Sequence, residues 1–148
     1  MKTSKNAIKK CRACYSKKIL NVISFGNLYL SDFVKTNKTA IEQILINLVA
    51  NAIKYNDKEN AAIEIEVLEE DDFYKISVDD NGPGILKDYH EIIFQIFEVV
   101  SNQDRFGKKG NGIGLATVKK IVEDLGGTIR VESEMGKGSK FIFTIARL

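Results

Sequence analysis

The feature that most constrains this chain is an alternating segment that ends in a glycine-rich turn. Residues 74–80 alternate apolar and polar side chains, as a half-buried β-strand does, and the turn at residues 81–84 contains two glycines. Side chains two residues apart in a strand share one face, so Ile76, Val78 and Asp80 are predicted to point to the apolar side. A carboxylate on that side is costly unless hydrogen-bond donors meet it.

The turn suggests which donor meets Asp80. The exocyclic amine of a purine would serve, and Gly82 and Gly84 would let a flat ring approach the backbone. The alternative is an ordinary turn that closes a strand, because Asn-Gly and Pro-Gly pairs are common in loops. On this stretch alone, both interpretations stay open.

A second glycine cluster, residues 110–115, leads into a helical pattern predicted over residues 113–125. A glycine-rich loop that opens a helix presents free backbone N–H groups and a positive dipole end, which suits phosphate. It is neither the dinucleotide fingerprint, because no strand runs straight into it, nor a P-loop, because the lysine and hydroxyl positions are absent.

A helix is predicted over residues 39–55, and it carries two stripes. At about 100° per residue, one stripe is apolar and consists of Ile41, Leu45, Leu48, Val49, Ala52 and Ile53. The bordering stripe is polar and consists of Asn47, Asn51, Lys54 and Tyr55. A carboxamide oxygen suits Mg²⁺, a lysine suits a phosphate, and a tyrosine ring can stack on a base. The alternative is a solvated helix edge with a capping asparagine.

The remaining elements are predicted from the same periodicities. They are a basic helix over 3–20, one or two strands within 21–34, strands over 63–67 and 74–78, a short helix over 88–97, and a closing hairpin of strands 128–133 and 140–145. This order predicts an α+β fold, a two-layer sandwich with a mixed sheet and helices on one face. Residues 1–36 form an N-terminal helix and strand segment of the same domain, and residues 37–148 form its core.

Composition excludes several classes of protein. The 148 residues hold 22 basic and 20 acidic side chains, so no nucleic acid or other polyanion is implied as a partner. No apolar run long enough to span a membrane and no signal peptide is present. Cys11 and Cys14 form the only Cys-x-x-Cys pair, which is too few ligands for structural zinc and fits free thiols in a cytoplasmic setting.

With these pieces in order, the sequence closely resembles the ATP-binding catalytic domain of bacterial sensor histidine kinases, of the GHKL or Bergerat-fold superfamily. Residues 47–55 look like the asparagine box, residues 80–85 like the first glycine box, residues 93–98 like the phenylalanine box and residues 110–115 like the second glycine box. The match runs over roughly residues 37–146. A structural protein with coincidental glycines is the competing interpretation.

The resemblance implies ATP and Mg²⁺ as cofactors and assigns roles by position. Asp80 would accept a hydrogen bond from the adenine amine, and Asn51 would help to hold Mg²⁺. Asn47 and Lys54 would face the phosphates, and together with Asn51 they would carry the catalytic role. Tyr55 would pack on the adenine. The other nucleotide-binding positions that the resemblance implies are Gly82, Gly84, Ile85, Phe97, Arg105, Gly110, Gly112, Ile113, Gly114, Leu115 and Thr144.

One position separates subclasses of this superfamily. Hydrolysing relatives have a water-activating glutamate where this chain has Asn47, which cannot act as a general base near neutral pH. The resemblance therefore implies a protein-histidine kinase that transfers the γ-phosphoryl group. A serine kinase and a non-catalytic ATP sensor are the alternatives.

The acceptor is expected on another polypeptide segment. Such kinases phosphorylate a histidine on a separate dimerising hairpin, whereas His90 lies between two nucleotide boxes and is interpreted as a loop or short-helix residue. The expected partners are that dimerisation domain and, indirectly, a response regulator, with this segment monomeric and not in contact with the membrane. The lid arginine would align near Asn102, which leaves Arg105, Lys108 or Lys109 to contact phosphate.

Overall fold

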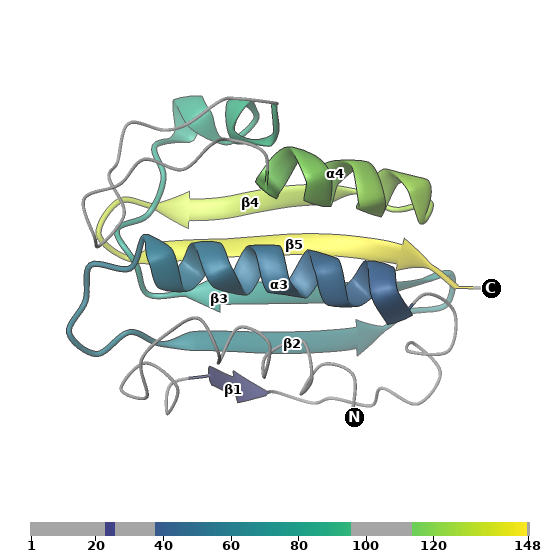
Figure 1. Cartoon of the computed structure of the whole chain (residues 1–148), viewed down its shortest axis with the longest axis horizontal. Helices are drawn as coiled ribbons and strands as arrows, with labels where there is room; N and C mark the ends of the chain where they lie inside the picture. Colours follow the sequence, from purple (N-terminus) through teal and green to yellow (C-terminus); the bar gives the residue numbers. More distant parts are fainter. Residues whose placement is uncertain (1–22, 26–37, 96–113, 148) are drawn as a thin grey trace.

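In the described part of the chain, five strands form one mixed sheet, and helices α3 and α4 cover one of its faces (Figure 1). The computed structural model describes residues 23–25, 38–95 and 114–147. Within these ranges the elements are β1 (Ile23–Phe25), α3 (Lys38–Lys54), β2 (Ile63–Glu69), β3 (Phe73–Asp80), the 3-10 turns η2 (Lys87–Tyr89) and η3 (Ile92–Phe94), α4 (Gly114–Asp124), β4 (Ile129–Glu134) and β5 (Gly138–Ala146).

The sheet order is β1-β2-β3-β5-β4. The short β1 runs parallel to β2, and the other neighbours are antiparallel, so the predicted mixed sheet is confirmed. The register between β3 and β5 places Asp80 opposite Ser139. The end of β3 and the start of β5, which belongs to the closing hairpin, therefore lie side by side.

The core lies between the sheet and the two helices. Every member of the predicted apolar stripe of α3 is buried, and Ile44 joins it with no exposed surface. From α4, Val118 and Val122 are fully buried against the same layer. Each such aliphatic side chain contributes about 1.5–3 kcal/mol when it leaves water, so the helix periodicity is fixed by packing on the sheet.

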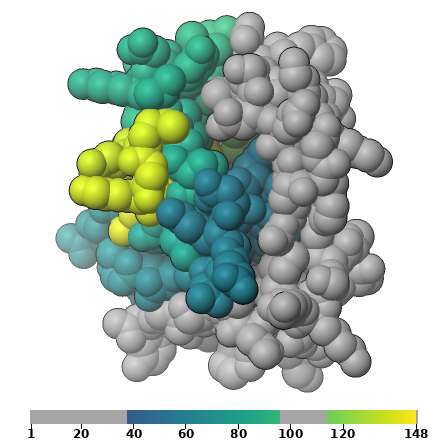
Figure 2. Space-filling model, turned by 90° about the vertical axis from the view of Figure 1, so that its left-hand side faces the viewer, coloured from purple at the N-terminus to yellow at the C-terminus, as the bar shows by residue number. Residues whose placement is uncertain are grey.

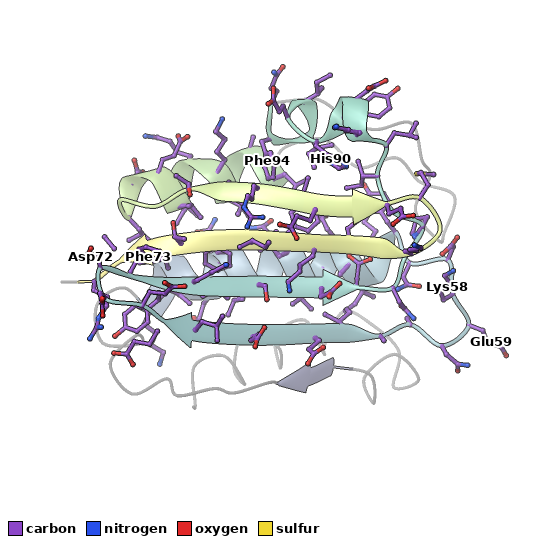
Figure 3. The ribbon with its side chains drawn as sticks, turned by 180° about the vertical axis from the view of Figure 1, so that it is seen from behind. Lys58, Glu59, Asp72, Phe73, His90 and Phe94 are labelled. Carbon is purple, nitrogen blue, oxygen red and sulfur yellow. The ribbon has the colours of Figure 1, made fainter. Side chains whose placement is uncertain are left out.

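The face of the sheet that the helices leave open carries alternating charges, and it faces the viewer in Figure 3. Asp79 and Lys140 are opposite each other in this layer, and Ser77 lies opposite Ile142. Ser77 lies on that open face, as its parity predicts, but it is buried there by its neighbours. The strand parity is confirmed for Asp79, which is exposed.

One predicted element is wrong in its form. The short helix predicted over 88–97 is replaced by two separate 3-10 turns, η2 and η3. The backbone N–H of His90 donates to Lys87 O at i−3, and that of Gln95 donates to Ile92 O, after which Gln95 is extended. These tight turns let Ile93 and Phe94 enter the core without a continuous helix.

The other predicted elements are confirmed within small shifts of their ends. Helix α4 ends at the predicted stop, where Gly126 adopts a φ of 75° and the N–H of Gly127 donates to Val122 O. The predicted helix over 3–20 and the second strand near residues 28–30 lie outside the described residues. None of the described helices combines the length and the hydropathy that crossing a bilayer requires.

Candidate functional site

Asp80 ends β3 with its side chain on the face that the helices cover. Its Oδ1 accepts a hydrogen bond from the backbone N–H of Gly82 at 2.8 Å. Burial raises the pKa of Asp80 to about 6, while hydrogen bonds from the backbone of Gly82 and Ser139 oppose that rise. The predicted inward carboxylate is thus confirmed, and part of its hydrogen-bonding capacity is met by the protein backbone.

The turn after Asp80 is held against the β4–β5 hairpin. The N–H of Gly136 donates to Pro83 O at 2.8 Å, and the N–H of Ile85 donates to Ser133 Oγ at 2.7 Å. Gly84 has a φ of +81°, and a Cβ there would lie 2.2 Å from Glu134 O. This close approach explains why a glycine is required at this place.

The polar stripe of α3 lies beside the core, as predicted, with all four side chains partly buried. Asn47 donates from Nδ2 to Gln43 O at 2.9 Å, and a Cβ added at Gly114 would lie 3.1 Å from Asn47 Oδ1. The Lys54 Nζ lies 5.3 Å from the centre of the Tyr55 ring. Among the described residues, the carboxamide of Asn51 has no hydrogen-bond partner.

These parts converge at one end of the molecule. In Figure 1 the C-terminal end of α3, the start of α4, the end of β3 and the β4–β5 hairpin lie on the same side. Figure 2 looks at this side, with the segment around the end of α3 in blue beside the yellow hairpin. The Nζ of Lys58 donates to Gly136 O at 3.4 Å, which joins the same two parts. Two carboxamides, a lysine, a tyrosine and a carboxylate are therefore carried by segments that meet at this end of the fold.

The structure brings together most, but not all, of the predicted site residues. Gly82, Gly84, Ile85, Gly114 and Leu115 lie within this end of the structure. Phe97, Arg105, Gly110, Gly112 and Ile113 lie outside the described residues, so their predicted roles stay predictions.

Thr144 is not brought to this cluster, contrary to its predicted nucleotide-binding role. It pairs with Lys75, in the same layer as Asp79 and Lys140, which is the open face of the sheet. Its Oγ1 accepts from the N–H of Thr128 at 3.0 Å. The physical reason is strand parity, because Thr144 is an odd number of residues from Ser139, which lies opposite Asp80.

His90 has a structural role in this part of the chain. His90 follows η2. Its Nε2 donates a hydrogen bond to Ile85 O at 2.9 Å, because a carbonyl oxygen can only accept. The ring is therefore used to close the loop after Gly84, in agreement with its interpretation as a loop residue.

Two polar residues of the site, Ser139 and Asn56, were not predicted from the sequence. Ser139 is buried opposite Asp80, and its Oγ lies 2.8 Å from Ser133 Oγ. Asn56 directly follows the polar stripe and is only 1% exposed. Strand parity could have placed Ser139 on the inner face of the hairpin, but its pairing with Asp80 depends on the register, and no local pattern marks Asn56.

The raised pKa of Asp80 predicts a pH-dependent difference in stability. The folded pKa of about 6 exceeds the unfolded value of 3.8, so the contribution of Asp80 is fully present below about pH 4 and is lost as pH rises through 6. Relative to the wild type, Asp80→Asn should therefore gain unfolding free energy between about pH 4 and pH 7, by up to about 3 kcal/mol. Urea unfolding of both proteins across this pH range measures the difference in their free energies of unfolding.

An exposed aspartate provides the control for this experiment. Asp88→Asn, in η2, should show no comparable gain. A difference between wild type and Asp80→Asn that stays constant with pH would contradict the buried environment assigned to Asp80.

Comparison with known proteins agrees with this geometry. Residues 36–147 match the family described as histidine kinase-, DNA gyrase B- and HSP90-like ATPase. The chain is 43% identical over 122 residues to cyanobacterial phytochrome B of Nostoc sp., covering 80% of this chain and 16% of that protein. It is 41% identical over 117 residues to histidine protein kinase 1 of Candida albicans, covering 77% of this chain and 5% of that protein.

Solved structures give the same result. The catalytic domain of histidine kinase ThkA superposes with a TM-score of 0.69 and 31% identity, and the match covers 96% of this chain and 92% of that one. The mycobacterial sensor histidine kinase MprB has the same fold, with a TM-score of 0.73 at 19% identity. The chain belongs to the histidine kinase-, DNA gyrase B- and HSP90-like ATPase family. Within that family its relatives are histidine kinases, and the chain is an ATP-binding domain of their type.

Proposed function

We propose that this chain is the catalytic domain of a sensor histidine kinase, which binds Mg²⁺-ATP and donates the γ-phosphoryl group to a histidine on a separate dimerisation domain. The observation that carries the proposal is the convergence of the Asp80 carboxylate, the polar stripe of α3 and the start of α4 at one end of the fold. A base acceptor and phosphate-binding groups at a single site are what ATP requires.

The base end of the site is formed by β3. With one oxygen of Asp80 bonded to Gly82, the carboxylate keeps lone pairs for the adenine amine. The close packing of Gly84 on the backbone of Glu134 holds this turn against the β4–β5 hairpin. Ser139, on the same face as Asp80, places a buried hydroxyl beside this carboxylate.

The phosphate end is formed by α3 and α4. Asn51 offers a carboxamide oxygen that has no hydrogen-bond partner among the described residues, and this is a type of ligand that Mg²⁺ accepts. The residues present thus fit a magnesium ion, which would neutralise charge on the transferring phosphoryl group. Lys54 would meet a phosphate as a point charge, and the first N–H groups of α4 add a positive dipole end close to Asn47.

Asn47 favours transfer to a protein acceptor over hydrolysis. Its Nδ2 is engaged by Gln43 O, and a carboxamide has no proton-accepting capacity near neutral pH. Water is therefore not activated by this residue. The domain would act by positioning ATP and stabilising charge in the transition state, as is usual in phosphoryl transfer.

The partners and the location of the whole protein are part of the same proposal. The chain spans 16% of cyanobacterial phytochrome B and 5% of the Candida kinase, so the acceptor hairpin, a response regulator and the cytoplasmic location are inferred from the kind of protein. We expect this segment alone to be monomeric.

The test is transfer of label from γ-labelled ATP to a supplied acceptor hairpin domain in the presence of Mg²⁺. An acid-labile phosphoprotein is the expected product, because phosphohistidine is acid-labile. An acid-stable product would favour a serine kinase, and tight ATP binding with no transfer to any acceptor would favour an ATP sensor. Either outcome would overturn the assignment as a histidine kinase.

A further inference from the structure

We propose that Asn56 and Asn81 form a positioning pair that ties the phosphate-binding helix α3 to the base-binding turn, and that this pair sets the selectivity of the site for an amino-purine. The inference rests on the proposed function, since it concerns how the same nucleotide site recognises its base. Neither residue contacts the transferring phosphoryl group in this proposal.

The pair is a direct side-chain hydrogen bond between segments far apart in sequence. Asn56 Nδ2 donates to Asn81 Oδ1 at 2.9 Å. Asn56 lies two residues after the end of α3, and Asn81 directly follows Asp80 at the end of β3. A displacement of either segment would therefore be transmitted to the other.

The orientation of both carboxamides is fixed by backbone donors. Asn56 Oδ1 accepts from the N–H of Lys58 at 2.8 Å, and Asn81 Oδ1 accepts from the N–H of Ala62 at 2.8 Å. Since a backbone N–H can only donate, each of these side-chain atoms is the oxygen. The Nδ2 of Asn56 is then the only group of the pair that can bridge to Asn81 Oδ1.

Asn81 is anchored on its remaining sides as well. Its Nδ2 donates to Asn60 O at 2.9 Å, and its own N–H donates to Ala62 O at 3.2 Å. Asn56 is 1% exposed, so the loss of its partner would leave a buried polar group unsatisfied. The pair is therefore a rigid connection and not a pair of solvated side chains.

The connection reaches Asp80 through Gly82. A Cβ at Gly82 would lie 2.8 Å from Asp80 Oδ1 and 3.7 Å from the Cα of Asn56, so Asn56 packs against the residue whose N–H holds the carboxylate. Removing the Asn56 side chain would free the turn to move away from α3. The carboxylate would then lose its fixed direction toward a base amine.

The experiment compares the affinity for ATP with that for ITP, both with Mg²⁺, by calorimetry. ITP has a carbonyl oxygen in place of the amine, so the ATP:ITP ratio reports the hydrogen bond to Asp80 and not the phosphate contacts. Wild type should prefer ATP by at least about tenfold. In Asn56→Ala and in Asn81→Ala the ratio should fall to within about threefold, and the double variant should show no further fall because the two residues act as one unit.

The matched control is Asn60→Ala, in the same loop. Asn60 is exposed and contributes its backbone carbonyl to Asn81, which alanine keeps, so its ATP:ITP ratio should equal that of wild type. If Asn56→Ala does not fold, Asn56→Ser, which leaves a smaller void and keeps a hydroxyl, takes its place in the same measurement.

The outcomes separate this inference from the proposed function. If wild type prefers ATP and the variants keep that preference while only their melting temperatures fall, the pair is merely structural and the inference is overturned. If wild type itself does not distinguish ATP from ITP, the base-recognition role of Asp80 in the proposed function fails, and the inference fails with it.

Discussion

Asp80→Asn is expected to weaken ATP binding about ten- to a hundredfold, corresponding to roughly 1.5–3 kcal/mol for a hydrogen bond to a charged acceptor. The carboxylate accepts hydrogen bonds from the backbone of Gly82 and Ser139 and keeps further lone pairs for the adenine amine. Asparagine offers only one oxygen, and its NH₂ group would face the amine donor. Calorimetric titration with ATP or a slowly hydrolysed analogue, with and without Mg²⁺, measures the loss.

Stability provides the internal control for this variant. The same substitution removes a buried charge whose pKa is raised to about 6, so at neutral pH the variant should be at least as stable as wild type. Weaker binding by a more stable protein cannot be explained by partial unfolding. Binding of equal strength in both proteins would exclude Asp80 as the base acceptor, whereas the lack of binding in either would mean that this domain needs a further segment.

Asn51→Ala is expected to abolish Mg²⁺-ATP-dependent phosphorylation of a supplied acceptor hairpin, with a loss of more than about a hundredfold, since a bound metal contributes several kcal/mol to stabilising the transition state. Asn51 lies on α3 between Asn47 and Lys54, and its carboxamide has no hydrogen-bond partner among the described residues. Its loss therefore breaks no described hydrogen bond. Initial rates of label transfer measure the effect.

Magnesium dependence distinguishes a metal ligand from a residue that only shapes the helix. In wild type, Mg²⁺ should strengthen ATP binding, and in Asn51→Ala the affinities with and without Mg²⁺ should converge. Gln43→Ala, an exposed carboxamide two turns earlier on the same helix, should retain both activity and Mg²⁺ dependence because its contact with Asn47 uses the backbone. Full activity of Asn51→Ala would refute the proposed magnesium site.

The elements of this fold could be predicted because their signals are local. A period of two placed Asp80 on the inner face of β3, and a period of 3.6 separated the two stripes of α3. Both patterns arise from the direction in which successive side chains leave the backbone. The 3-10 turns at 87–94 were missed because burial of Ile93 and Phe94 gives the same apolar pattern as a short helix.

Other features of the site depend on which segments meet, and the tertiary structure alone decided them. Ser139 lies opposite Asp80 because of the register of β3 with β5, and that same register places Thr144 on the open face, away from the site. Asn56 and Asn81 are 25 residues apart in the sequence, and nothing local marks them as partners. Pairing of strands and packing of a helix on a sheet bring such residues together, because hydrogen bonds that are buried must be satisfied by whatever group the fold places beside them.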